Sequence, residues 1–273
     1  MPARGKDRIK FLGTAGARFV MITQFRSSAG TVLSLKGTNV LIDPGPGTLV
    51  RFASCKPKLN PAKLHAIILT HKHLDHSNDV NVMIEAMTEG GFKPRGVLLC
   101  PNDALSDEGD AVILNYYKHL LDRVEVMTEG GNYTIGQIEI NTPKRHVHGV
   151  ETYGLNIKER GGKRTKVSFL VDTLYFDGLA DYYDGEVLVM NVAMYERREG
   201  VNHLCVNDAR TIIETRKPRP KVVILTHFGM TMLRNKPWEI AKRLSEETGV
   251  DVIAAHDGME FELDEYSHSS NKL

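Results

Sequence analysis

The chain has 273 residues, of which 41% are hydrophobic and 25% are charged, and this composition is typical of a globular protein with a substantial core. Its formal net charge of +1 argues against a generally basic surface for nucleic acid, although a local basic patch stays compatible with it. No apolar run approaches the roughly 18 residues of a membrane span, and no apolar signal segment follows the first basic residues. We therefore expect a cytoplasmic protein that does not bind membranes.

Short apolar runs that are rich in β-branched residues and end near glycine or proline recur along the chain, and they are typical of β-strands. We expect strands at residues 9–13, 31–35, 39–45, 66–70, 96–100, 138–143, 152–157, 166–173, 187–192, 221–227 and 251–255. In the first half these runs follow one another as in hairpins. In the second half they alternate with helical patterns.

Apolar residues at spacings of three and four predict helices over residues 79–91, 108–124, 207–218 and 235–249. Asn207 or Asp208 is the expected N-cap of the third helix. In the fourth, Pro237 falls in the first turn and Gly249 follows the last. No repeat, low-complexity tract or linker divides the chain. We expect a single domain over residues 1–273, of the α/β or α+β class, with a sheet core covered by helices.

The run AIILTHKHLDHSND, residues 66–79, begins like a buried strand and ends in a cluster of titratable side chains. His71, His73, Asp75 and His76 fall within six positions. Such groups are costly to bury without partners, and loops at the carboxyl ends of strands gather catalytic groups in α/β folds. A solvated loop would have little use for so many of them, whereas divalent transition metals bind this donor set. The run therefore predicts a metal site.

This run also matches the HxHxDH signature of the metallo-β-lactamase superfamily, which the chain resembles along its whole length. FLGTAGA and VLIDPGPGT, before the signature, are similar to that family's opening strands. His148 in RHVHGVETYGL, Asp172 in SFLVDT and His227 in VVILTHFG then follow in the family's order, each at a strand end. The resemblance implies a four-layer αββα sandwich, in which helices flank two central sheets.

The resemblance assigns a role to each of these residues. It gives one metal His71, His73 and His148, and the other Asp75, His76 and His227, with Asp172 bridging the two. Asp43 takes the place of an acid that hydrogen bonds to the metal-binding loop in the family. His146 shares a strand face with His148, so spacing leaves both open as the third ligand. The following GVETYG is similar to RNase Z, which favours His148 and leaves His146 to support the ligands or contact substrate.

Two metals about 3.5–4 Å apart hold a bridging hydroxide and stabilise the entering and leaving oxygens of a displacement. The predicted donors are imidazoles and carboxylates only, so Zn²⁺, Mn²⁺ and Fe²⁺ are all admissible. We expect two divalent ions, with zinc as the first candidate.

The chain lacks the GHTPG-type motif of glyoxalase-II-like thioesterases and lactonases, and is similar instead to RNase Z and the related cyclic phosphodiesterases. In that branch a further histidine acts as general acid or clamps the phosphate, and His203 in GVNHLCVNDARTII takes its place. The alternative for His203 is a solvent-facing residue at a helix N-terminus. We expect Asp75 and His203 to be the catalytic residues. His256, at the end of the last apolar run, is a further candidate to face the site.

Two departures separate the chain from RNase Z. The interval from His148 to Asp172, where RNase Z carries a long tRNA-binding arm, is only 24 residues, which leaves room for a hairpin. In addition, NVAMYE replaces the HEAT-like segment. Both argue against tRNA 3′ maturation. The hairpin contains KERGGKRTK, residues 158–166, which is either a phosphate-steering tip or, as we favour, a solvated edge.

These features predict a binuclear metal-dependent phosphodiesterase that acts on a small or nucleotide-like phosphodiester. A metal-bridging hydroxide would attack phosphorus while His203 protonates the leaving oxygen. Three alternatives stay open: an RNA or DNA nuclease of RNase Z type without the arm, a lactone, thioester or amide hydrolase, and a non-catalytic metal-binding module. A homodimer is compatible with the sequence, which does not define the oligomeric state.

Overall fold

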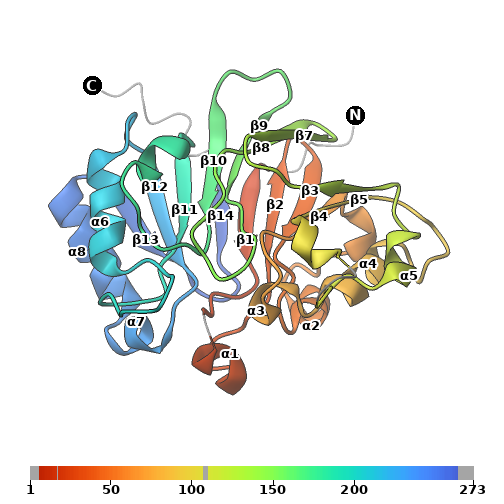
Figure 1. The fold of residues 1–273 in the computed structure, drawn as a ribbon, viewed down its shortest axis with the longest axis horizontal. Coiled ribbons are helices and arrows are strands. Elements are labelled where there is room, and N and C mark those ends of the chain that lie inside the picture. Colours follow the sequence, from red (N-terminus) through yellow and green to blue (C-terminus); the bar gives the residue numbers. More distant parts are fainter. Residues whose placement is uncertain (1–5, 17, 107–109, 264–273) are drawn as a thin grey trace.

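The computed structural model describes residues 6–16, 18–106 and 110–263, and within them the strands form two seven-stranded sheets (Figure 1). The first sheet runs in the order β14 (Glu260–Glu262), β1 (Arg8–Phe11), β2 (Thr31–Leu35), β3 (Thr38–Ile42), β4 (Ala66–Ile68), β5 (Val97–Cys100) and β6 (Arg123–Val126). The second runs in the order β13 (Asp251–Ala254), β12 (Val222–Thr226), β11 (Val187–Asn191), β10 (Thr165–Leu170), β9 (Leu155–Glu159), β8 (Ile138–Thr142) and β7 (Gly131–Ile135).

Helices lie on the outer side of each sheet (Figure 1). The α-helices are α1 (Phe19–Thr23), α2 (Thr48–Ser54), α3 (Leu74–Ser77), α4 (Val80–Met87), α5 (Asn115–Lys118), α6 (Val206–Thr215), α7 (Met230–Arg234) and α8 (Pro237–Thr248). Three 3₁₀ turns are η1 (Pro61–Lys63), η2 (Asn102–Ala104) and η3 (Leu179–Tyr182). No helix in the described ranges is long and apolar enough to cross a membrane.

The core consists of three apolar layers that follow from the alternation of side chains along the strands. In β4, Ala66 and Ile68 pack between the sheets, whereas Ile67 packs outward with the apolar faces of α2 and α4. The second sheet repeats this arrangement: Val189 of β11 faces the first sheet, and Leu188 packs outward with α6 and α8. Each sheet is therefore buried on both faces. This arrangement confirms the predicted αββα sandwich and its single domain; the predicted limits of 1–273 stay a prediction.

Strand direction brings the predicted site residues together. Strands β3 to β6 are parallel to one another, and so are β10 to β13. The carboxyl ends of parallel strands meet at one edge of a sheet, where α/β proteins place their ligand sites. Asp43 follows β3 and His71 follows β4 in the first sheet, while Asp172 follows β10 and His227 follows β12 in the second. The loops from both sheets meet at this edge.

The prediction of a helix over residues 108–124 is wrong for most of its length. Within the described residues 110–124 only α5 is α-helical, and the last residues enter β6. The side chain of Asn81 donates to the carbonyl of Val112 and accepts from the N–H of Leu114. Contacts with α4 thus satisfy this backbone without a helix, so tertiary structure overrides an apolar spacing that suits one.

Three strands escaped prediction, β6, β7 and β14, and each lies at the edge of a sheet. Edge strands are short and carry polar residues that discourage further pairing, which weakens the apolar alternation that reveals a strand.

Helices α6 and α8 match the predicted ranges 207–218 and 235–249 to within a few residues, with one correction at a cap, whereas α7 was not predicted. The N-cap of α6 is Cys205 and not Asn207 or Asp208, because Asp208 is the third helical residue and its Oδ2 accepts the N–H of Cys205 at 3.0 Å. Helix α8 begins at Pro237, and Gly249 caps it in the left-handed conformation, φ 68°.

Candidate metal centre

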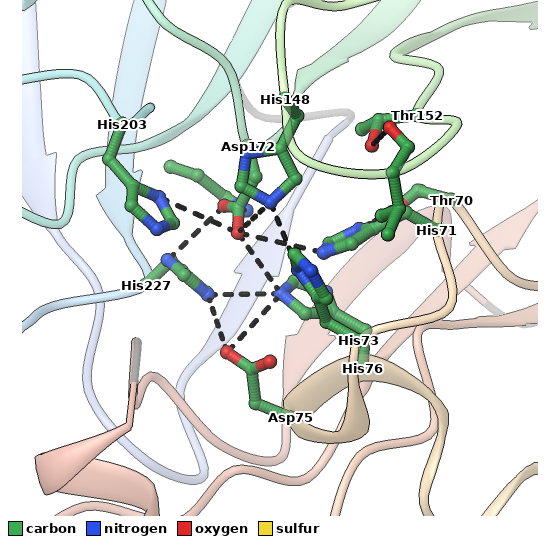
Figure 2. A network of polar contacts seen from close by, with 12 residues as sticks. Thr70, His71, His73, Asp75, His76, His148, Thr152, Asp172, His203 and His227 are labelled. Atoms are coloured by element: carbon green, nitrogen blue, oxygen red, sulfur yellow. Dashed lines mark hydrogen bonds and ion pairs between the residues drawn. The ribbon is translucent and has the colours of Figure 1, made fainter. Parts of the chain in front are cut away.

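Side chains from both sheets converge on one cluster of imidazole and carboxylate groups (Figure 2). Four overlapping sets of three have donor atoms within 4.8 Å of one another. Two of them combine Asp43 with His71 and His76, and His203 with His148 and Asp172; the other two are His71, His73 and His148, and Asp75, His76 and His227. The last two are the ligand sets that the sequence resemblance implies. The structure thus brings the predicted groups together around two points.

The carboxylate of Asp43 organises the part of the cluster that follows β4. Its Oδ1 accepts the N–H of Thr70 at 2.7 Å, and its Oδ2 accepts the Thr70 hydroxyl at 2.8 Å. Its Oδ2 also lies 2.9 Å from Nδ1 of His76. Since an ionised carboxylate only accepts hydrogen bonds, Nδ1 of His76 carries a proton, which leaves Nε2 as the nitrogen that faces the cluster.

The same tautomer follows for two further histidines. The Thr70 hydroxyl already donates to Asp43, so at 3.1 Å it accepts from Nδ1 of His71. Nδ1 of His148 donates to the carbonyl of Asn202 at 3.0 Å. In both rings Nε2 is therefore the bare nitrogen, and it faces the cluster.

Two buried ring nitrogens lack hydrogen-bond partners among the described residues, Nε2 of His71 and Nδ1 of His227. An unsatisfied buried polar atom is costly, and a missing ion is one of its recognised causes. In addition, Nε2 of His76 lies 3.0 Å from Nε2 of His227, and Nε2 of His148 lies 3.0 Å from Nδ1 of His73. Pairs of nitrogen donors at this separation fit shared cations, so the residues present suit divalent metal ions.

The carboxylate of Asp172 lies at the centre of the imidazoles (Figure 2). Its Oδ2 lies between 3.5 and 3.9 Å from the nearest ring nitrogens of His71, His76, His148 and His203, and its Oδ1 lies 3.3 Å from Nδ1 of His227. Asn191, at the end of β11, donates to Oδ1 at 2.9 Å and fixes the carboxylate plane. Asp172 is the group that both three-residue sets share as a neighbour.

The pKa shifts of Asp172 and His76 are those expected of a site where a metal ion displaces a proton from its ligands. Burial acts to raise the pKa of Asp172, yet the imidazoles of His227 and His203 hold it well below its usual range. Burial acts to lower the pKa of His76, but the carboxylates of Asp75 and Asp43 raise it well above its usual value. The metal-free cluster therefore retains a proton that a metal ion must displace.

The loops that carry the cluster contain both backbone strain and close packing. Asp43 and His227 have positive φ angles, 52° and 60°, which non-glycine residues seldom adopt and which concentrate at functional sites. A Cβ at Gly45 would lie 2.0 Å from the carbonyl oxygen of Asp75, and one at Gly16 would lie 2.2 Å from that of His227. Glycine is therefore required at both positions for the loops to approach each other.

His203 lies beside the two sets. Its Nδ1 is 3.6 Å from Oδ2 of Asp172, and its ring centroid is 5.2 Å from that of His148. Burial, opposed by Asp172, lowers the pKa of His203 to about 4. The solvent-facing alternative does not describe it, since only 14% of its side chain is exposed.

The structure separates His146 from His148. His146 is buried, its Nδ1 donates to the backbone carbonyl of Asp172 at 3.1 Å, and its Nε2 contacts the hydroxyl of Tyr183. It contacts the backbone of Asp172 and the side chain of Tyr183 and does not face the cluster. His256 is exposed and contacts the carbonyl of Asp257, so the structure does not bring it to the site.

The basic hairpin between β9 and β10 precedes β10, whereas Asp172 follows that strand, so the hairpin lies at the opposite end of the sheet from the cluster (Figure 1). Lys158 pairs with Glu139 at 3.0 Å, and Lys166 pairs with Glu186 at 3.4 Å. The hairpin is a charged edge and not part of this site.

Sequence reasoning missed the groups that orient the cluster, namely Thr70, Asn191 and Asn202. Thr70 directly precedes His71, and Asn191 ends a parallel strand, so both occupy positions where such a role is expected. Asn202 acts through its backbone carbonyl, for which residue type carries no signal.

An αββα sandwich whose strand ends carry this cluster is a metallo-β-lactamase fold with a candidate metal centre. Residues 38–228 match the beta-lactamase superfamily domain family. The chain belongs to the metallo-β-lactamase superfamily, and its relatives place it in the RNase Z-like branch.

Three known proteins illustrate the relationship. The chain is 29% identical to the uncharacterized protein MJ1374 of Methanocaldococcus jannaschii over 258 residues, covering 93% of this chain and 94% of that protein. It is 24% identical to ribonuclease Z of Thermococcus onnurineus, covering 96% and 88%. The structure of the metallo-beta-lactamase fold protein YhfI from Bacillus subtilis superposes with a TM-score of 0.73 at 18% identity, covering 94% of this chain and all of that one, which supports the shared fold.

Asp43→Asn tests whether this outer carboxylate orients the cluster. An amide offers one acceptor oxygen where the carboxylate offers two, so Thr70 or His76 loses its partner and the metal affinity falls about 10- to 100-fold. Competition titration of Zn²⁺ against a chromophoric chelator measures the change.

Asp7→Asn is the matched control. Asp7 is buried, whereas Asp43 is half-buried, and Asp7 likewise accepts a backbone N–H, that of Lys36 at 2.7 Å. It precedes β1, however, at the opposite end of the sheet from the cluster. Equal affinity losses in the two variants would contradict the orienting role of Asp43.

Proposed function

We propose that this protein is a binuclear metal-dependent phosphodiesterase that hydrolyses a small or nucleotide-like phosphodiester. Three observations support the proposal: membership of the metallo-β-lactamase superfamily, similarity to proteins named ribonuclease Z, and two sets of converging donor atoms. The observation that carries the phosphodiester assignment is the position of His203, which adjoins Asp172 and His148 but is not a member of the two ligand sets that the resemblance implies.

In this proposal His71, His73 and His148 hold one ion, Asp75, His76 and His227 hold the other, and Asp172 contacts both. When bound, such a pair of divalent ions supplies a nucleophilic water of lowered pKa and neutralises the charge on the phosphate oxygens. The donor set admits zinc, manganese or iron, and we propose zinc first. The hydrogen bonds of Asp43 and Asn202 fix the ligand imidazoles before the ions arrive.

His203 is the proposed general acid, and Asp75 is the proposed catalytic carboxylate of the second set. With a pKa of about 4, lowered by burial, His203 is neutral in the free protein at pH 7. A phosphodiester anion bound beside it raises that pKa by direct charge interaction. His203 then holds a proton within reach of the leaving oxygen, where alkoxide charge develops.

The fold supports a small substrate better than a folded RNA. The short hairpin between β9 and β10 lies away from the site, and two of its three lysines, Lys158 and Lys166, pair with acidic neighbours. The site opens instead into a cavity of about 880 Å³, a size that suits a small ligand.

A nuclease acting on RNA or DNA is the second candidate, because several relatives carry the name ribonuclease Z. Binding to a polyanion is steeply salt-dependent, since each neutralised phosphate releases counterions. A small phosphodiester shows little of this dependence, so the salt response of the Michaelis constant separates the two candidates.

The proposed reaction is tested on protein loaded in turn with Zn²⁺, Mn²⁺ and Fe²⁺. We expect hydrolysis of bis-p-nitrophenyl phosphate and of 2′,3′-cyclic nucleotides, and loss of both activities after chelation, because the nucleophile depends on the ions. A parallel panel of lactones, thioesters and amides addresses carbonyl chemistry. Turnover of that panel alone, or no turnover with any ion, would refute the proposal.

His203→Ala distinguishes a general acid from a residue that merely lines the site. Loss of a general acid costs about 100-fold or more when the leaving group is the alkoxide of a 2′,3′-cyclic nucleotide. The cost is much smaller for p-nitrophenolate, which leaves without a proton. His256→Ala, at an exposed histidine outside the cluster, is the control and leaves both rates unchanged. Equal rate losses of His203→Ala on the cyclic nucleotide and on the p-nitrophenyl ester would contradict the role of His203 as general acid.

A further inference from the structure

The cavity in front of the cluster has a wall that the proposed chemistry does not use. Its inner end is formed by His73, Asp75, His148, Asp172 and His203, which belong to the candidate metal centre. Its sides are formed by α1, by parts of the segment 193–202 that precedes His203, and by the start of α7. In Figure 1, α1 stands apart from both sheets, beyond the strand ends.

Helix α1 exposes large apolar side chains on the side that lines this cavity. Phe19 and Ile22 are 72% and 70% exposed, and both line it, as does the half-buried Met21. Residues three apart lie on the same face of a helix, so Phe19 and Ile22 form one apolar strip. Val20, by contrast, is buried and anchors the helix.

The opposite wall is also apolar. Met194, Val201 and Met230 line it, and Leu74, which is 61% exposed and follows His73 in the sequence, lines the cavity too. Exposed apolar patches beside a polar site are typical of ligand-binding surfaces, and methionine adapts to flat or irregular partners.

Two arginines, Arg18 and Arg198, line the same cavity and are exposed. Neither side chain makes a hydrogen bond or ion pair within the described ranges, whereas the adjacent Arg197 pairs with Asp208. A guanidinium without a protein partner beside a concave site is suited to an anionic ligand group such as a phosphate.

We propose that α1 and the facing loops form a subsite for an apolar, aromatic ester group of the substrate, with Phe19 and Ile22 as its contact residues and Arg18 and Arg198 neutralising the phosphodiester. This subsite rests on the proposed function, since it holds the ester group that is not cleaved. The occupant is a small molecule and not a second copy of the chain, because the apolar strip faces a concave, arginine-lined space continuous with the metal centre.

Two substrates with the same leaving group test the subsite, benzyl p-nitrophenyl phosphate and methyl p-nitrophenyl phosphate. In each, water cleaves the P–O bond to p-nitrophenolate and leaves the benzyl or methyl phosphate. We expect the wild-type kcat/KM to favour the benzyl ester about tenfold or more, because an apolar pocket discriminates by that order. Phe19→Ser abolishes most of this preference and leaves the methyl ester almost unaffected.

Phe25→Ser is the matched control, since Phe25 is 69% exposed, follows the same helix and does not line the cavity. We expect Phe25→Ser to keep the wild-type preference for the benzyl ester. Calorimetric binding of benzylphosphonate against methylphosphonate to the metal-loaded proteins repeats the comparison without turnover. If neither ester is hydrolysed, the proposed function fails, and the phosphonate comparison still decides the subsite.

Three results would overturn the subsite: no wild-type preference for the benzyl group in turnover or binding, a preference that survives Phe19→Ser, or an equal loss in the two serine variants. Sedimentation velocity adds a fourth. A wild-type dimer that both variants convert to monomers would show that a second copy covers α1.

Discussion

The site depends on one carboxylate, that of Asp43, which does not itself face the cavity. It accepts hydrogen bonds from the backbone and hydroxyl of Thr70 and from Nδ1 of His76, and through Thr70 it fixes the tautomer of His71. Because neutral imidazole binds a metal through one nitrogen only when the other holds the proton, these contacts decide which atoms are available. The positive φ of Asp43 indicates that the loop accepts local strain to keep this carboxylate in place.

The fold brings together the loops that follow the parallel strands of the two sheets. Each sheet is buried on both faces, so its strand ends are held rigidly, and glycines at positions 16 and 45 allow backbone contacts that a Cβ would prevent. Asp172 from the second sheet then lies among imidazoles from both. Rigid elements with a satisfied outer ring of hydrogen bonds are what hold a polar centre in one geometry.

The sequence predicts which side chains converge because they resemble the signature residues of the metallo-β-lactamase superfamily, and that resemblance implies the two ligand sets. HKHLDH places four side chains in one loop, and His148, Asp172 and His227 each end or follow an apolar run. Spacing alone could not separate His146 from His148, because the difference is which of them reaches Tyr183 and which reaches Asn202; only the resemblance of GVETYG favoured His148. The edge strands β6, β7 and β14 and the helix α1 were missed, since polar composition hides these strands and a five-residue helix is too short for periodicity. The apolar wall of the cavity follows only from tertiary structure.

The claim on which everything else rests is that this cluster holds two divalent ions through imidazoles oriented from outside. Anomalous diffraction at the zinc edge from crystals of the metal-loaded protein measures this directly. We expect two zinc peaks per chain, one about 2.0–2.1 Å from Nε2 of His71 and of His148 and the other at that distance from Nε2 of His76, with the Asp172 carboxylate beside both. A single peak, no peak, or a peak on His146 would contradict it.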